Sequence, residues 1–215
     1  MSQALTQLQA ADLVFWDFDG VIKDSVAVKT VGYEQLFLPF GPALASRVRQ
    51  HHEAHGGVSR YEKIRLYLDW AGEPVTQARV DEFCARFSQL VLQAVIDSPW
   101  VPGVREYLQE HRTRQHFVLI TATPKDEIDQ ILRLLDLAAC FRSVFGSPTP
   151  KAVAIREVLT LSRASPDGAL VVGDSETDLD AALANGVGFL LRRTTLNQKL
   201  QERHPAPAFD TLRES

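Results

Sequence analysis

The sequence predicts an α/β fold built on a parallel sheet, with an all-helical segment inserted after the first strand. Short apolar runs alternate with helical patterns, and most of these runs are apolar at every position rather than at every second one. Continuously apolar strands are typical of parallel sheets that helices cover on both faces. About a hundred residues separate the first two runs, far more than one crossover helix needs.

Five apolar runs are the predicted strands. They cover residues 13–16, 117–120, 143–145, 169–172 and 187–191. The helices between them have recognisable ends. We expect Thr123 and Thr149 to be N-caps, each followed by proline at the first helical position, and Asn185-Gly186 to end a later helix.

The inserted segment is predicted to be helical between residues 25 and 98. The expected helices are 26–37, 42–55, 60–70 and 77–96. Ser59 and Glu62 have the spacing of a capping box at the start of the third. A subdomain inserted here would cover the carboxyl ends of the strands, where open α/β sheets bind their ligands.

Composition and charge exclude several classes of function. The 215 residues include 23 Lys and Arg against 27 Asp and Glu, a net charge of −4. A nucleic-acid partner is therefore not expected, because such proteins usually concentrate basic residues. Cys84 and Cys140 lie far apart in apolar surroundings, so we expect neither a disulfide nor a zinc site. No signal peptide or membrane-spanning run is recognisable, and a cytoplasmic protein without a membrane partner is expected.

Polar side chains stand where several strands and loops end at one edge of the predicted sheet. They are Asp17, Asp19, Thr121, Lys151, Asp174 and Asp178. Because parallel strands all point the same way, this topology gathers their carboxyl ends in space. Carboxylates from two strands beside a bound phosphate would repel one another without a metal, and an oxygen-only ligand set suits Mg²⁺.

Taken singly, most of these residues also fit a purely structural role. Asp19 and Gly20 are ordinary turn residues, and Lys151 could extend into solvent. Asp178 could form a capping box with Ser175. Only the conjunction of all the positions favours a catalytic site.

The four motifs resemble those of the haloacid dehalogenase superfamily, in the branch of phosphoglycolate phosphatases and β-phosphoglucomutases. The motifs read Asp17-Phe18-Asp19-Gly20, Thr121, Lys151 and Gly173-Asp174-Ser175-Glu176-Thr177-Asp178. The resemblance covers nearly the whole chain. It implies a Rossmann-like catalytic core over residues 1–23 and 99–215, with an inserted helical cap over residues 24–98.

The resemblance implies a phosphatase mechanism. Asp17 would be the nucleophile that forms an aspartyl-phosphate, and Asp19 would protonate the leaving alcohol and later deprotonate water. Thr121, the backbone amide of Ala122 and Lys151 would hold the phosphoryl oxygens.

The resemblance also implies a Mg²⁺ site. Its ligands would be the Asp17 carboxylate, the backbone carbonyl of Asp19 and Asp174, while Asp178 would orient a metal-bound water or Lys151 from outside the ligand sphere. The segment before Lys151 departs from the family's lysine-then-proline pattern, which leaves Lys125 as the alternative lysine.

The cap is expected to choose the substrate. Residues 57–60 resemble a β-phosphoglucomutase segment whose arginine contacts a second anionic group. Arg60 and Lys23 are therefore predicted to bind a small anionic phosphomonoester, such as a sugar phosphate or a phosphoglycolate-like molecule.

Other functions stay open on the sequence alone. A phosphomutase would use the same nucleophile, and a catalytically silent binding protein could share the fold. A signalling receiver is disfavoured, because receivers are shorter and lack a cap. Turnover that depends on Mg²⁺ would separate these classes, and a monomer or homodimer is expected.

Overall fold

A six-stranded parallel sheet lies at the centre of the protein, whose computed structural model describes residues 3–204 and 207–213. The strand order is β3-β2-β1-β4-β5-β6. The strands are β1 (Leu13–Trp16), β2 (His116–Pro124), β3 (Ser143–Ser147), β4 (Ala169–Gly173), β5 (Gly188–Arg192) and β6 (Ala208–Phe209). The predicted parallel α/β fold is confirmed.

The register of the sheet aligns the strand ends that carry the motifs. Trp16, the last residue of β1, is paired with Leu119 of β2 on one side and with Val172 of β4 on the other. The residues that follow β1 and β4, and those at the end of β2, therefore lie at the same edge of the sheet.

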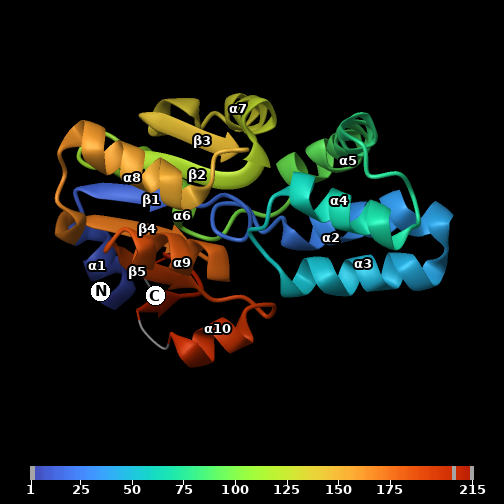
Figure 1. Cartoon of the computed structure of the whole chain (residues 1–215). Coiled ribbons are helices and arrows are strands. Elements are labelled where there is room, and N and C mark those ends of the chain that lie inside the picture. Colours follow the sequence, from blue (N-terminus) through green and yellow to red (C-terminus); the bar gives the residue numbers. More distant parts are fainter. Residues whose placement is uncertain (1–2, 205–206, 214–215) are drawn as a thin grey trace.

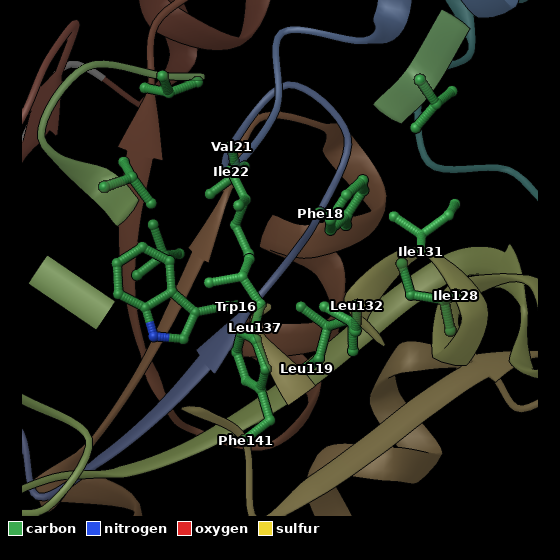
Figure 2. Close-up of a cluster of buried hydrophobic side chains, with 14 of the residues drawn as sticks. Trp16, Phe18, Val21, Ile22, Leu119, Ile128, Ile131, Leu132, Leu137 and Phe141 are labelled. Carbon is green, nitrogen blue, oxygen red and sulfur yellow. The ribbon is translucent and has the colours of Figure 1, made fainter. Parts of the chain in front are cut away.

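Helices cover both faces of the sheet. They are α1 (Gln3–Ala10), α6 (Val104–His111), α7 (Lys125–Leu134), α8 (Lys151–Ser162), α9 (Glu176–Ala184) and α10 (Gln198–Arg203). Because successive side chains of a strand point to opposite faces, Trp16 packs in the cluster that contains α7, whereas Phe15 packs in the cluster of α8 and α9. Figure 2 shows Trp16, Leu119 and Leu132 of α7 among the side chains of the first of these clusters.

The inserted segment forms a helical bundle beside the sheet (Figure 1). Its helices are α2 (Val26–Phe37), α3 (Pro42–Ala54), α4 (Arg60–Trp70) and α5 (Gln77–Asp97), within one residue of the predicted bounds. Aromatic rings form its interior: Tyr33 stacks on Phe87 with ring centroids 4.0 Å apart, and Phe37 packs edge-on against Tyr67 at 5.5 Å. Among the described residues, none of the helices has the length and apolarity that crossing a bilayer requires.

Two predicted helix starts were wrong by one residue. Thr123 does not cap α7, because β2 continues to Pro124, and α7 begins at Lys125. Pro150 likewise precedes α8 instead of beginning it. Both prolines have ψ near 143°, an extended conformation that leaves each of them outside its helix. The Ser59 cap of α4 is confirmed, since its hydroxyl accepts a hydrogen bond from the amide of Tyr61 at 3.3 Å.

Candidate active site

Lys151, at the first residue of α8, joins two of the predicted carboxylates. Its ammonium lies 3.0 Å from Asp17 Oδ2 and donates a hydrogen bond to Asp178 Oδ1 at 2.6 Å. All three side chains are buried. Lys125, the alternative lysine, instead forms an exposed ion pair with Asp129. The structure thus brings Lys151, and not Lys125, to the motif aspartates.

Asp17 carries too much neighbouring negative charge for one lysine to balance. Burial raises its pKa to about 7, and the Asp178 and Asp19 carboxylates add to the rise, while Lys151 opposes it. A further cation beside Asp17 would lower its pKa and keep the carboxylate ionised. An ionised carboxylate is what nucleophilic attack needs.

The carboxylates of Asp17, Asp174 and Asp178 offer oxygens that all lie within 4.8 Å of one another. The Asp178 oxygens are already engaged: Oδ1 accepts from Lys151, and Oδ2 accepts from the Ser175 hydroxyl at 2.5 Å and amide at 3.2 Å. No hydrogen bond or ion pair from the described residues reaches the Asp174 carboxylate. Burial and the nearby carboxylates raise the pKa of Asp174 well above its ordinary value. These oxygen donors, left with unbalanced charge, fit a hard divalent cation such as Mg²⁺.

Gly20 lets the chain pass close to Asp174. Its φ is +79°, and a Cβ built on it would lie 2.1 Å from Asp174 Oδ2. Glycine meets both requirements, because it tolerates positive φ and occupies no space beyond the backbone.

The substitution Gly20→Ala is therefore expected to weaken Mg²⁺ binding more than tenfold, by displacing the Asp174 carboxylate. Calorimetric titration with Mg²⁺ measures the affinity. Gly72→Ala is the matched control, since Gly72 has a φ of +71° but open space where its Cβ would stand. Equal Mg²⁺ affinities of the two variants would contradict the expectation.

Asp19 lies in a network that reaches into the inserted bundle. Its carboxylate accepts hydrogen bonds from Ser25 Oγ at 2.6 Å, from Thr123 Oγ1 at 3.1 Å and from the ammonium of Lys29. Lys29 also donates to Thr123 Oγ1 at 2.8 Å. Although burial alone would raise it, the pKa of Asp19 is lowered by Lys29 and by these hydrogen bonds.

Lys29 is a site residue that the sequence reasoning missed. It lies on α2, and the sequence offered one signal, a single charged residue among the apolar and small residues of the first two turns of that helix. A buried lysine needs a partner, and here the partner is Asp19, ten residues earlier.

Thr121 and Ala122 lie on β2 and, with Asp17, line a cavity of about 670 Å³ between the sheet edge and the helical bundle. Thr121 is 2% exposed, and its Oγ1 accepts a hydrogen bond from the Thr123 amide at 3.2 Å. The bundle closes on the core through Gly57, where an added Cβ would lie 2.0 Å from Thr177 Oγ1. The cavity therefore has the predicted aspartates and threonine at its core end and the bundle at its other end.

Arg60, predicted to bind an anionic group of the substrate, has a protein partner in this structure. Its two terminal nitrogens donate to the carboxylate of Glu127 on α7, at 2.7 and 2.6 Å, and one of them also donates to Ser88 Oγ at 2.5 Å. The side chains are only 3% and 8% exposed. The guanidinium charge is thus neutralised inside the protein. Because Arg60 also lines the cavity, its contact with the substrate stays a prediction.

Lys23, the second predicted substrate contact, likewise has partners within the protein. It is 1% exposed, donates a hydrogen bond to the carbonyl of Ile96 at 2.8 Å and lies 4.4 Å from the centre of the Trp100 ring. Lys23 is not among the described residues that line the cavity. Lys23 instead ties the end of α5 to the segment that follows β1.

Accordingly, Lys23→Met is expected to leave the relative turnover of anionic and neutral phosphomonoesters unchanged, because Lys23 faces Ile96 and Trp100 instead of the cavity. Steady-state kcat/KM for one ester of each kind provides the measurement. A selective loss on the anionic ester would restore Lys23 as a substrate contact.

The comparisons with known proteins agree on one family. A family model described as haloacid dehalogenase-like hydrolase matches residues 14–191. Phosphoglycolate phosphatase 1 of Pseudomonas aeruginosa is 30% identical, covering 94% of this chain and 77% of that protein. The phosphoglycolate phosphatase of Pseudomonas savastanoi pv. phaseolicola is 27% identical with the same coverage. The crystal structure of a predicted phosphoglycolate phosphatase from Haemophilus somnus 129PT has a TM-score of 0.76 at 19% identity, covering 94% of this chain and 95% of that one, and shows likeness of fold alone.

Proposed function

The chain belongs to the haloacid dehalogenase-like hydrolase family, and we propose that it is a Mg²⁺-dependent phosphatase of small phosphomonoesters. One observation carries the proposal: the buried carboxylate of Asp17 and the half-buried carboxylate of Asp174 lie together near Lys151, at the carboxyl ends of neighbouring parallel strands. That arrangement suits the binding of a phosphoryl group between an anionic nucleophile and its balancing cations.

In the proposed first step, a carboxylate oxygen of Asp17 attacks phosphorus while the bond from phosphorus to the ester oxygen breaks. Asp19 gives its proton to the leaving oxygen. In the second step, Asp19 takes a proton from water, the water oxygen attacks phosphorus, and the acyl-phosphate bond breaks to free Asp17 and inorganic phosphate.

The remaining residues balance charge and position the reacting groups during both steps. Lys151 balances charge on Asp17 and on the phosphoryl group, and Asp178 holds Lys151 in place. Thr121 and the amide of Ala122 offer donors to phosphoryl oxygens from the end of β2. Mg²⁺, held by Asp17, Asp174 and the carbonyl of Asp19, would supply further positive charge to the phosphoryl oxygens.

Residues 24–98 are proposed to act as the cap that selects the substrate. The cavity of about 670 Å³ lies within the range of small-molecule sites and has room for a sugar phosphate. The relatives are named for phosphoglycolate, so a phosphoglycolate-like or sugar phosphate substrate with a further negative charge is the proposed class. A cytoplasmic location and a monomer or homodimer stay predictions from the sequence.

We favour a phosphatase over the alternative of a phosphomutase. That alternative rested on Arg60 as a contact for a second phosphate, and Arg60 is neutralised by Glu127. A silent binding protein is not favoured either, because the sequence keeps Asp17, Asp19 and Lys151, and the loss of activity usually removes one such residue.

Phosphate release from a panel of phosphomonoesters, with Mg²⁺ and with a chelator, tests the proposed function. We expect release that requires Mg²⁺, with the ranking of the esters revealing what the cavity selects. Failure to release phosphate from any ester at saturating Mg²⁺ would overturn the proposal.

A further inference from the structure

Lys63, on α4, is a buried cation that lacks an acidic partner. It is 2% exposed and lines the cavity, yet no carboxylate of the described residues lies within ion-pair distance of it. The other buried cations that line the cavity, or lie beside Asp17 next to it, all have one: Lys29 has Asp19, Arg60 has Glu127, and Lys151 has Asp17. A charge buried in this way is costly unless something neutralises it.

His52, on α3, is the hydrogen-bond partner of Lys63. Lys63 Nζ lies 2.9 Å from His52 Nδ1. When Lys63 is charged, its ammonium donates to this nitrogen, because an ammonium has no acceptor. The neutral imidazole then carries its proton on Nε2, and this buried nitrogen has no hydrogen-bond partner among the described residues. His52 also lines the cavity. Lys63 and His52 therefore each have N–H groups without an acceptor among the described residues.

The surroundings favour an anionic ligand over a neutral one. Burial and the Lys29 ammonium lower the pKa of Lys63 to about 7, with Asp19 and Glu62 opposing the shift. A bound anion would favour the charged form of the lysine and relieve the repulsion from Lys29. Acceptor oxygens that carry negative charge would therefore suit both residues.

We propose that Lys63 and His52 form a second anion subsite, at the bundle end of the cavity, for a carboxylate or phosphate carried by the substrate. The subsite rests on the proposed phosphatase function, because the substrate's ester phosphate would occupy the site at Asp17. It replaces Arg60 and Lys23 as the source of charge selectivity. It also explains why an unbalanced lysine is kept in the interior of the bundle.

Three esters built on one sugar skeleton test the subsite: glucose 6-phosphate, 6-phosphogluconate and glucose 1,6-bisphosphate. We expect wild type to prefer one or both of the doubly anionic esters. Lys63→Met should lower kcat/KM for the preferred ester by about tenfold or more, mainly through KM, and leave glucose 6-phosphate unchanged. The ester with the larger loss identifies the group as carboxylate or phosphate.

Lys199→Met is the matched control. Lys199 lines the same cavity but is exposed, so its loss should not change the preference. Lys63→Met removes a buried charge, and we expect it to fold with a melting temperature at or above that of wild type.

Binding measured by calorimetry in the Asp17→Asn background separates the two hypotheses. If wild type releases no phosphate from any ester, the proposed function fails. The subsite fails when Lys63→Met binds the three esters with the same ratios of affinity as the parent protein, when it loses all three equally, or when Lys199→Met has the same effect.

Discussion

Replacing Asp17 by asparagine is expected to abolish Mg²⁺-dependent phosphate release, with a fall in kcat on the order of 10⁴-fold or more, as is typical when a nucleophile is removed. The amide keeps the shape of the side chain but cannot form the acyl-phosphate bond. The loss should appear with every ester, because all of them would transfer their phosphoryl group to the same oxygen. A colorimetric phosphate assay at saturating Mg²⁺ measures it.

Asp180→Asn is the matched control for this experiment. Asp180 is an exposed residue of α9, and its variant should keep full activity. Retention of more than a few per cent of the activity in Asp17→Asn would mean that another group attacks phosphorus. Rapid quenching of wild type should also trap a hydroxylamine-labile phosphoenzyme that the variant does not form.

The largest expected effect on stability is that of Arg60→Met. The substitution would leave the Glu127 carboxylate buried between α4 and α7 without its cation. Breaking a buried ion pair on one side typically costs about 3–5 kcal/mol, and we expect a loss of that order in the free energy of unfolding. Urea denaturation at pH 7 measures the loss.

Two further variants make the stability test specific. Arg49→Met removes an exposed ion pair with Glu34 and Glu53, and little change is expected. The double variant Arg60→Met/Glu127→Leu removes both charges and should recover most of the stability. If the single and double variants lose the same amount, the ion pair is not the cause. In either case the ratio of kcat/KM for anionic and neutral esters should stay unchanged, in contrast to Lys63→Met.

The contribution of this ion pair should depend on pH in the acid range. Although burial alone would raise it, the pKa of Glu127 is lowered from 4.5 by the hydrogen bonds and charge of Arg60. The folded-state pKa thus lies below the unfolded-state pKa, and the stabilisation is fully present above about pH 4.5 and lost as pH falls through the folded-state pKa. The stability difference between wild type and Arg60→Met should therefore narrow on acidification. A difference that stays constant below pH 4 would contradict this explanation.

Most of the fold could be predicted from the sequence because local patterns specify it. Continuous apolar runs placed β1 and β4 in a covered parallel sheet, and helical periodicity placed α2 and α4 at their observed bounds. The strand β6, only two residues long, has no pattern that separates it from a loop, and its pairing with β5 depends on where the end of the chain packs.

The motif residues were also predictable, because a parallel sheet gathers the ends of its strands. Asp17, Asp174 and Asp178 meet as expected, and Lys151 lies among them. The family resemblance read from these motifs is confirmed by the comparisons.

The sequence by itself determined the α/β architecture, the place of the insertion and the residues gathered at the sheet edge, because periodicity and chain direction encode all three. Only the tertiary structure decided which buried basic residues of the inserted segment have a carboxylate partner among the described residues and which have none. Arg60 pairs with Glu127, 67 residues away, whereas Lys63 has His52 as its hydrogen-bond partner and no carboxylate partner among the described residues. Such pairings depend on how α3, α4 and α7 pack against one another, and a basic side chain looks the same in a sequence whether or not packing brings a carboxylate to it.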